Sequence, residues 1–263
     1  MIYRKTSLSL LFFLLGLFSL PTLILAQPLR IVTENMPPYN YQTNKGKLSG
    51  PSTEVVRALL KSLKLKTQIE VLPWARAYKL ATTEPDVMIF SIIRSPAREP
   101  LFHWLEGIGP IDIQVFAMPD AGISSLNNLN TLEDLTLGIL RDSSQIDFIK
   151  DRYSIPEHNI IAGKSYEQLY RMNQRGRVNL FAAPALLSTY LNHKLNTKVS
   201  QQPISVYTIP STKQRKLHLA FSKATSLDTV AQFRKALATM QQNGEVKQIF
   251  ANFQAHWATR HTE

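Results

Sequence analysis

Apolar runs alternate with amphipathic stretches in the part of the chain that follows residue 28. Three runs of mainly apolar residues predict strands, at 29–33, 68–72 and 86–90. Between the first two, apolar residues recur three and four positions apart from Val55 to Leu63, which predicts a helix over 51–64. A second helix is predicted over 74–82. The order is therefore strand, helix, strand, helix, strand.

The same alternation continues after residue 110. Further strands are predicted at 111–118, 135–140, 159–162, 178–182, 204–209 and 217–221. Helices are predicted to begin after Ser143, Ser165 and Pro184, and Ser165 with Gln168 fits a capping box. Two helices close the chain, at 228–242 and 245–253. This order predicts an α/β fold with mainly parallel sheets, whose ligands bind at the carboxyl ends of the strands.

The first residues have the order of a secretory signal. Arg4 and Lys5 precede a nearly continuous Leu/Phe run over 8–20, and the segment ends in the small residue Ala26. We expect residues 1–26 to be a cleaved signal peptide that directs the protein to the periplasm. The alternative is an uncleaved anchor, because 8–26 is about as long as a short membrane span.

Composition removes several classes of chemistry. The 263 residues include no cysteine, which excludes thiol nucleophiles, cysteine-ligated metals and disulfides. The six histidines show no metal-ligand spacing, so neither a metal nor another cofactor is expected. The formal charge is +11, but the basic residues are scattered and the longest cluster is short, at 213–216. We therefore expect a solvated basic surface and no nucleic-acid partner.

Two local motifs fail on inspection. Gly163-Lys164-Ser165 mimics the end of a phosphate-binding loop, but His158 stands where that loop requires its first glycine. No Gly-x-Ser-x-Gly occurs, so there is no nucleophile elbow. The sequence predicts no catalytic residues, and we expect a protein that is not an enzyme.

Three ordered sets of motifs carry a family resemblance. The first set is Leu29–Tyr41, which ends in Pro-Pro-Tyr-Asn-Tyr and is followed by Gly-Lys-Leu-Ser-Gly at 46–50. The second is Asp86–Ser91, followed by Ser-Pro-Ala-Arg at 95–98. The third is Leu-Glu-Asp-Leu-Thr-Leu-Gly at 132–138, which precedes the segment 165–178. In this order they resemble the extracellular solute-binding proteins, family 3, of polar-amino-acid ABC transporters. The resemblance covers about 28–253.

This resemblance implies two α/β lobes, a type II periplasmic binding protein that closes on a solute. The first lobe would comprise 28–110 and 212–263, and the second 111–211, with hinge crossings near 109–112 and 208–212. The implied function is capture of a small carboxylate-bearing solute, an amino acid or related organic acid, by a monomer. The implied partner is an ABC permease in the inner membrane.

The anion site is expected around Arg98. A carboxylate that loses water needs charge-assisted hydrogen bonds, and the planar guanidinium supplies two in parallel. Arg98 stands where the family places its carboxylate-binding arginine, and Ser143 with Ser144 matches the family's Gly-Thr-Thr helix start, although Asp142 replaces the glycine. The alternatives are a surface arginine at 98 and a simple helix cap at Ser143.

Further residues are expected around the solute. Tyr39 and Trp74 are predicted to form its walls, with core packing as the alternative for each. Ser91 ends the Asp-containing strand motif and is included among the ligand-binding residues. Arg76 is a candidate for a second acidic group, as is Arg94, with solvated arginines as the alternative. Glu34 is a candidate partner for an amine, with a surface acid at the end of the strand as the alternative.

One departure limits the identity of the solute. Pro184 stands near the position where the family carries an aspartate that pairs with the solute's ammonium. Because an unpaired buried ammonium is costly, a standard amino acid is not assured. Two other functions stay open: a sensory module for a membrane receptor, and an enzyme resembling cyclohexadienyl dehydratases, for which Glu34 and Glu106 are the candidate acids.

Overall fold

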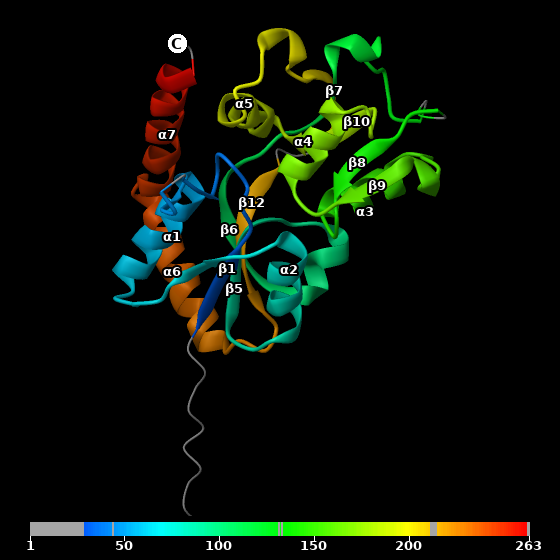
Figure 1. Cartoon of the computed structure of the whole chain (residues 1–263). Coiled ribbons are helices and arrows are strands. Elements are labelled where there is room, and N and C mark those ends of the chain that lie inside the picture. The colour runs from blue at the N-terminus through cyan, green and yellow to red at the C-terminus, as the bar shows by residue number, and fades with distance from the viewer. Residues whose placement is uncertain (1–28, 44, 131, 133, 211–214, 262–263) are drawn as a thin grey trace, which may run out of the picture.

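Two five-stranded sheets, each with its own helices, form the protein (Figure 1). The computed structural model describes residues 29–261 except 44, 131, 133 and 211–214, so the expected signal peptide at 1–26 lies outside this part. None of the helices in the described part is long and apolar enough to cross a bilayer. We call the elements around the two sheets the first lobe and the second lobe.

The first sheet has the strand order β4-β1-β5-β12-β6. Its strands are β1 (Arg30–Thr33), β4 (Ile69–Val71), β5 (Val87–Ile93), β6 (Phe102–Pro110) and β12 (Lys216–Ser222). β1 runs parallel to β4 and β5, whereas β12 runs antiparallel to both β5 and β6. Half of the strand pairs in this sheet are therefore antiparallel.

Helices cover both faces of the first sheet. They are α1 (Pro51–Ser62), α2 (Trp74–Thr83), α6 (Leu227–Gln242) and α7 (Glu245–His261). α1 and α6 lie on one side of the strands and α2 on the other, while α7 runs beside α1 (Figure 1). Val55, Val56 and Leu59 of α1 are fully buried, as the helical spacing of its apolar residues predicts.

The second sheet has the strand order β11-β7-β10-β8-β9. Its strands are β7 (Ile113–Ala117), β8 (Leu137–Leu140), β9 (Ile160–Gly163), β10 (Leu180–Pro184) and β11 (Ile204–Thr208). β8 is parallel to β9 and β10, and β7 is antiparallel to β10 and β11. The helices of this lobe are α3 (Ser144–Arg152), α4 (Tyr166–Gln174) and α5 (Ala185–Lys194).

Short elements complete the chain. A two-stranded hairpin, β2 (Tyr41–Gln42) with β3 (Leu48–Ser49), precedes α1. Four 3₁₀ helices are present among the described residues: η1 (Pro96–Leu101), η2 (Pro119–Ala121), η3 (Glu157–Asn159) and η4 (Val199–Gln201). Of these, η1 corresponds to the Ser-Pro-Ala-Arg motif of the sequence.

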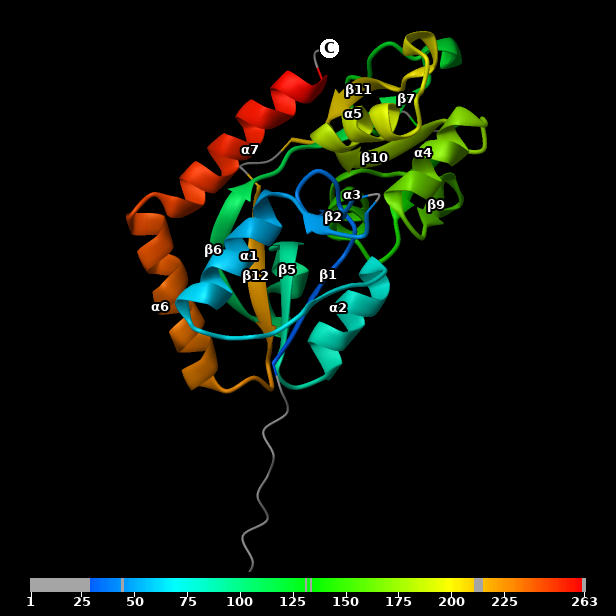
Figure 2. The ribbon, with the colours of Figure 1, turned by 60° about the vertical axis from the view of Figure 1, so that its left-hand side comes forward.

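The chain passes between the lobes twice. The first crossing joins β6 to β7 through residues 111 and 112, and the return joins β11 to β12 after Thr208. The two crossings lie side by side, because the amide of Ile111 donates to the carbonyl of Arg215 at 3.0 Å and that of Ile209 to Ile113 at 3.0 Å (Figure 2). Paired crossings of this kind let two lobes rotate about one line.

The prediction of mainly parallel sheets is wrong, because both sheets are mixed. The prediction followed from strand-helix-strand order, but β12 enters the first sheet from the return crossing and pairs antiparallel with its neighbours. Strand β6 was not predicted at all. Its Gly109 lies so close to the ring of Phe250 in α7 that a Cβ at this position would clash with the ring, and the strand is paired with β12.

The predicted capping box at α4 is confirmed in its first half. The Ser165 hydroxyl accepts a hydrogen bond from the amide of Gln168 at 3.2 Å. The Gln168 side chain accepts from the amide of Lys164 at 2.7 Å, one residue before the cap. The last helix extends to His261, beyond the predicted end at 253.

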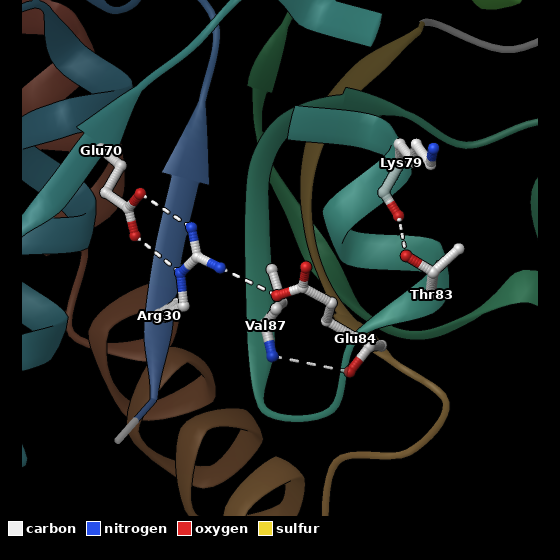
Figure 3. A network of polar contacts seen from close by, with 7 residues as sticks. Arg30, Glu70, Lys79, Thr83, Glu84 and Val87 are labelled. Atoms are coloured by element: carbon white, nitrogen blue, oxygen red, sulfur yellow. Dashed lines mark hydrogen bonds and ion pairs between the residues drawn. The ribbon is translucent and has the colours of Figure 1, made fainter. Parts of the chain in front are cut away.

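An ion-pair network joins Arg30 at the start of β1 to Glu70 of β4 and to Glu84, which follows α2 (Figure 3). Arg30 donates two hydrogen bonds to Glu70, both at 2.9 Å, and a third to Glu84 at 2.8 Å. These bonds raise the pKa of Arg30 and lower the pKa of the Glu70 carboxyl. Because both carboxylates are partly exposed, solvent screens the network and its contribution is modest.

We expect Arg30→Met to lower the free energy of unfolding by about 1 kcal/mol at low salt, because a network with a bidentate pair stabilises the fold more than a single exposed ion pair does. In 1 M NaCl the loss should shrink, because salt screens exposed charges. Urea unfolding at both salt concentrations measures this. Lys150→Met, which removes one exposed pair with Glu157, should cost less than half as much. An equal loss for the two variants would contradict the network.

Candidate ligand-binding cleft

A cavity of about 330 Å³ lies between the lobes. Glu34 and Trp74 contribute to it from the first lobe, and Tyr166 and Tyr190 from the second. We call it the Glu34 cavity. On its rim, Tyr41 of the first lobe meets Tyr190 edge to face, with ring centroids 5.2 Å apart. The lobes are thus in contact around a hollow that both of them line.

Arg98 is buried beside this junction. It belongs to η1, which follows β5, and only 3% of its surface is exposed. Its guanidinium carbon lies 5.1 Å from the ring centroid of Trp74 and 4.8 Å from that of Tyr78. Trp74 and Tyr78 are one turn apart on α2, so this helix presents two aromatic faces to the cation. The alternative of a surface arginine does not fit this burial.

The backbone of the second lobe meets Arg98 at one carbonyl. Arg98 Nη2 donates to the carbonyl oxygen of Asp142 at 2.8 Å, and Trp74 Nε1 donates to the same oxygen at 2.7 Å. Asp142 has φ of 55°, in the left-handed region that favours glycine and that aspartate tolerates better than most residues. Glycine adopts this region without strain, so the conformation is compatible with the glycine that the family motif has at this position. We call the two hydrogen bonds the Asp142 latch.

Removing the indole donor should loosen the latch. Trp74→Phe keeps an aromatic ring but loses one hydrogen bond between the lobes, which is worth about 1 kcal/mol. We expect the unliganded protein to shift towards open forms, and its radius of gyration in small-angle X-ray scattering to rise.

The matched control is Trp104→Phe. The Trp104 indole donates to the carbonyl of Glu99 within the first lobe. This variant should leave the radius of gyration unchanged. If both variants scatter like the parent protein, the latch does not hold the lobes together.

Two buried hydroxyls lie on the chain segments that meet at Arg98. Ser91 is the bulged residue of β5, with φ of 59°, and Ser143 occupies the N-cap position of α3. Both side chains are at least nine-tenths buried, and among the described residues neither hydroxyl oxygen has a hydrogen-bond partner. Buried polar atoms normally find a partner. Ser143 lies at the predicted start of the helix, but its side chain makes no cap hydrogen bond, so the alternative of a simple helix cap does not fit.

Glu34 is a buried carboxyl at the end of β1. Only 7% of its surface is exposed, and burial raises its pKa to about 8, although the positive charge of Arg98 acts in the opposite direction. Tyr166 lies close enough that the Glu34 charge adds to the rise of its pKa, which burial causes in the main. An acid in this state is protonated at neutral pH and ionises when a cation approaches.

The other predicted site residues lie as follows. Tyr39 is buried beside the start of α1, where its carbonyl accepts from Ser52, and it does not line the Glu34 cavity. Arg76 is exposed on α2 and does not line this cavity either. The side chain of Ser144 lies outside the described residues. Pro184 is buried at the end of β10.

The sequence prediction missed several residues of the cleft. Tyr166 lines the Glu34 cavity, Gln145 donates to the Tyr166 hydroxyl at 3.2 Å, and the ring of Tyr78 lies against the Arg98 guanidinium. The position of Tyr78 one turn after Trp74 was a usable signal. Tyr166 follows the Ser165 cap, but nothing local shows that this turn faces the first lobe. Among the described residues no group of acids and histidines is suited to hold a metal.

Comparison of the sequence with known protein families gives a match over most of the chain. The sequence matches the family of bacterial extracellular solute-binding proteins, family 3, over residues 29–256, and the protein belongs to this family. Its fold is that of the type II periplasmic binding proteins, with two lobes joined by two crossings. A comparison with curated proteins finds no match.

Solved structures with this fold have diverse roles. The chain is similar to a histidine kinase sensor domain that resembles periplasmic binding proteins, at 15% identity, a TM-score of 0.74, and coverage of 85% of this chain and 95% of that chain. An ancestral arginine-binding protein bound to arginine matches at 15% identity with a TM-score of 0.72, and the match covers 86% of this chain and 98% of that chain. The ancestral amino acid-binding protein AncCDT-1, a precursor of cyclohexadienyl dehydratase, matches at 14% identity with a TM-score of 0.67. This match covers 86% of this chain and 94% of that chain. At such low sequence identities, the similarity shows a shared fold and does not show a shared function.

Proposed function

We propose that the protein is a periplasmic solute-binding protein that captures a small carboxylate-bearing solute between its lobes. Residues 1–26 would be the cleaved signal peptide. Residues 28–110 with 212–263 would form the first lobe, and 111–211 the second. Family membership supports an extracellular or periplasmic binding role.

Arg98 carries the proposal. It is a buried cation at the lobe junction that donates to the backbone carbonyls of Ile93 and Asp142. The buried hydroxyls of Ser91 and Ser143, which have no hydrogen-bond partner among the described residues, lie on the segments beside it. A solute carboxylate would accept from the guanidinium and from these hydroxyls. One good bidentate contact and an apolar wall are compatible with a dissociation constant near 1 μM, which corresponds to about −8 kcal/mol.

Glu34 is the proposed partner of a solute amine. Pro184 stands near the position where the family carries an acid, and it offers neither a charge nor an amide donor. Glu34 is buried, lines the cavity and has a raised pKa. An ammonium group that enters the Glu34 cavity would ionise this carboxyl, so amino-acid binding would release a proton at pH 7.

Delivery to an ABC permease is the proposed next step, with the protein acting as a monomer. A sensory role is the second candidate, because a histidine kinase sensor domain is among the similar structures. Reconstitution with an ABC permease from the same organism would separate the two: uptake of the bound solute supports transport. Kinase activation by the liganded protein without uptake supports sensing.

We propose no catalysis. The raised pKa of Glu34 is the one property that suits a general acid, while Glu106 is exposed on β6. Incubation with prephenate and arogenate tests this directly. We expect both substrates to be recovered intact, and turnover would establish the enzyme in place of the binding protein.

A screen by thermal shift tests the proposed function. Mono- and dicarboxylic acids and the twenty amino acids are each added at 1 mM to purified mature protein. An acid with a dissociation constant of about 10 μM should add about 2.7 kcal/mol of stability at this excess, which is several degrees in melting temperature. Amines that lack a carboxylate should not shift the melting temperature. Stabilisation by neutral sugars alone would overturn the proposal.

A further inference from the structure

A second cavity lies between the lobes, next to the two crossings. It has a volume of about 280 Å³ and is lined by three arginines, Arg94 from the first lobe, Arg152 from α3 and Arg215 from the return crossing. Its apolar wall is formed by Ile113, Phe148 and Ile209. We call it the Arg152 cavity. Arginines and an apolar wall together favour an organic anion.

Two of the arginines share one aromatic ring. The guanidinium carbons of Arg215 and Arg152 lie 4.8 Å and 5.8 Å from the ring centroid of Phe148. Neither arginine forms an ion pair among the described residues. Burial lowers the pKa of Arg215, the charge of Arg152 lowers it further, and Asp112 offsets part of this. An anion between the two would relieve their repulsion.

Arg215 and Arg94 are already positioned by other contacts. Arg215 donates to the carbonyls of Ile209 and Pro210, both at 2.8 Å, which holds it against the return crossing and leaves other N–H groups of its fork available. Arg94 is paired with Glu99 and contributes little net charge. Arg152 is exposed, and among the described residues its guanidinium makes no hydrogen bond to a backbone carbonyl, although it interacts with the hydroxyl of Tyr153. It is therefore less tightly positioned than the other two arginines.

Gln145 links the two cavities. It lines the Arg152 cavity, is 5% exposed, and its side-chain oxygen has no hydrogen-bond partner among the described residues. Its nitrogen donates to the hydroxyl of Tyr166, which lines the Glu34 cavity. With the amide inverted, the oxygen would accept from Tyr166 and the nitrogen would point to a ligand. The backbone of Ile93, another lining residue, accepts from Arg98 at 3.4 Å.

We propose, building on the proposed function of the cleft, that the Arg152 cavity holds a second anionic group of the same solute. Arg98 binds one carboxylate and Arg152 with Arg215 binds the other, while the carbon chain between them packs on Ile93 and Phe148. The favoured solutes are then dicarboxylates or amino acids with an acidic side chain. The short basic cluster at 213–216 supplies Arg215 to this subsite.

Isothermal titration with a series of dicarboxylates tests the subsite. Malonate, succinate, glutarate, adipate, glutamate and aspartate are compared with monocarboxylates of the same chain length. We expect at least one diacid to bind with one molecule per chain, about tenfold or more tighter than its monocarboxylate. Arg152→Gln should reduce that preference about tenfold and leave the affinity for the monocarboxylate within twofold. The matched control is Arg175→Gln, an exposed arginine of the second lobe outside this cavity, and it should bind like the parent protein.

Three results would overturn the inference. Unchanged diacid affinity in Arg152→Gln would leave the cleft as a solute site but remove the second subsite. Two monocarboxylates per chain, one of them lost in Arg152→Gln, would indicate separate anion sites. Absence of binding by every acid in the parent protein would overturn the proposed function together with the subsite.

Discussion

Arg98→Met should weaken the binding of any stabilising acid by at least 100-fold. The variant keeps a side chain of similar length but removes the charge and all its N–H donors, and the loss corresponds to about 2.7 kcal/mol. Arg98→Lys should recover only part of this affinity, because an ammonium cannot form two parallel hydrogen bonds to a carboxylate. Isothermal titration with the best acid of the thermal-shift screen measures both variants.

Folding of the Arg98 variants needs its own check, since Arg98 is buried and donates to Ile93 and Asp142. Circular dichroism and the melting temperature without ligand report whether the fold survives, and Arg98→Lys serves where Arg98→Met unfolds. Arg57→Met removes an exposed arginine on α1 that pairs with Glu54 and should bind the acid normally. Full affinity in a folded Arg98 variant would contradict its role as the anion anchor.

We expect the parent protein to lose stability when the pH is raised from about 5 to 8, and Glu34→Gln should remove most of this loss. The pKa of Glu34 is raised above its ordinary value to about 8, so in this window the folded protein holds a proton that the unfolded chain has released. Stability therefore falls as pH rises towards 8, by at most about 4 kcal/mol. A neutral glutamine cannot ionise, so the variant should be more stable than the parent protein at pH 9 and similar to it at pH 5.

Urea unfolding at pH 5, 7 and 9 measures this effect. Glu106→Gln is the matched control, because Glu106 is exposed on β6, and it should keep the pH dependence of the parent protein. If Glu34→Gln also keeps that dependence, Glu34 is ionised in the folded protein and its proposed response to a solute amine fails.

Local sequence patterns determined much of the fold. The apolar spacing of α1 and the Ser165 cap of α4 are formed by neighbours in the chain, and both were predicted. The mixed sheets were not, because pairing of β12 with β5 and β6 depends on where the chain returns from the second lobe. Periodicity reports which face of a strand is buried and carries no information on the direction of the neighbouring strand.

Candidate site residues could be predicted from the sequence only where they belong to one continuous motif. Arg98 and Ser91 come from a single strand-turn segment, so the family motif makes both of them candidates, and their ligand-binding role stays a prediction. The burial of Glu34 and the contact of Gln145 with Tyr166 depend on the second lobe closing over the first. The role of Asp142 lies in its backbone carbonyl, which Arg98 and Trp74 share, and a side-chain motif cannot reveal such a contact.

A high-resolution crystal structure with the best acid of the screen tests the central claim most directly. We expect electron density for a carboxylate whose oxygens lie about 2.8 Å from the Arg98 guanidinium, within reach of the hydroxyls of Ser91 and Ser143. An acid bound elsewhere, with Arg98 still donating to the carbonyl of Asp142 and touching no solute, would contradict the claim that this buried guanidinium captures the solute.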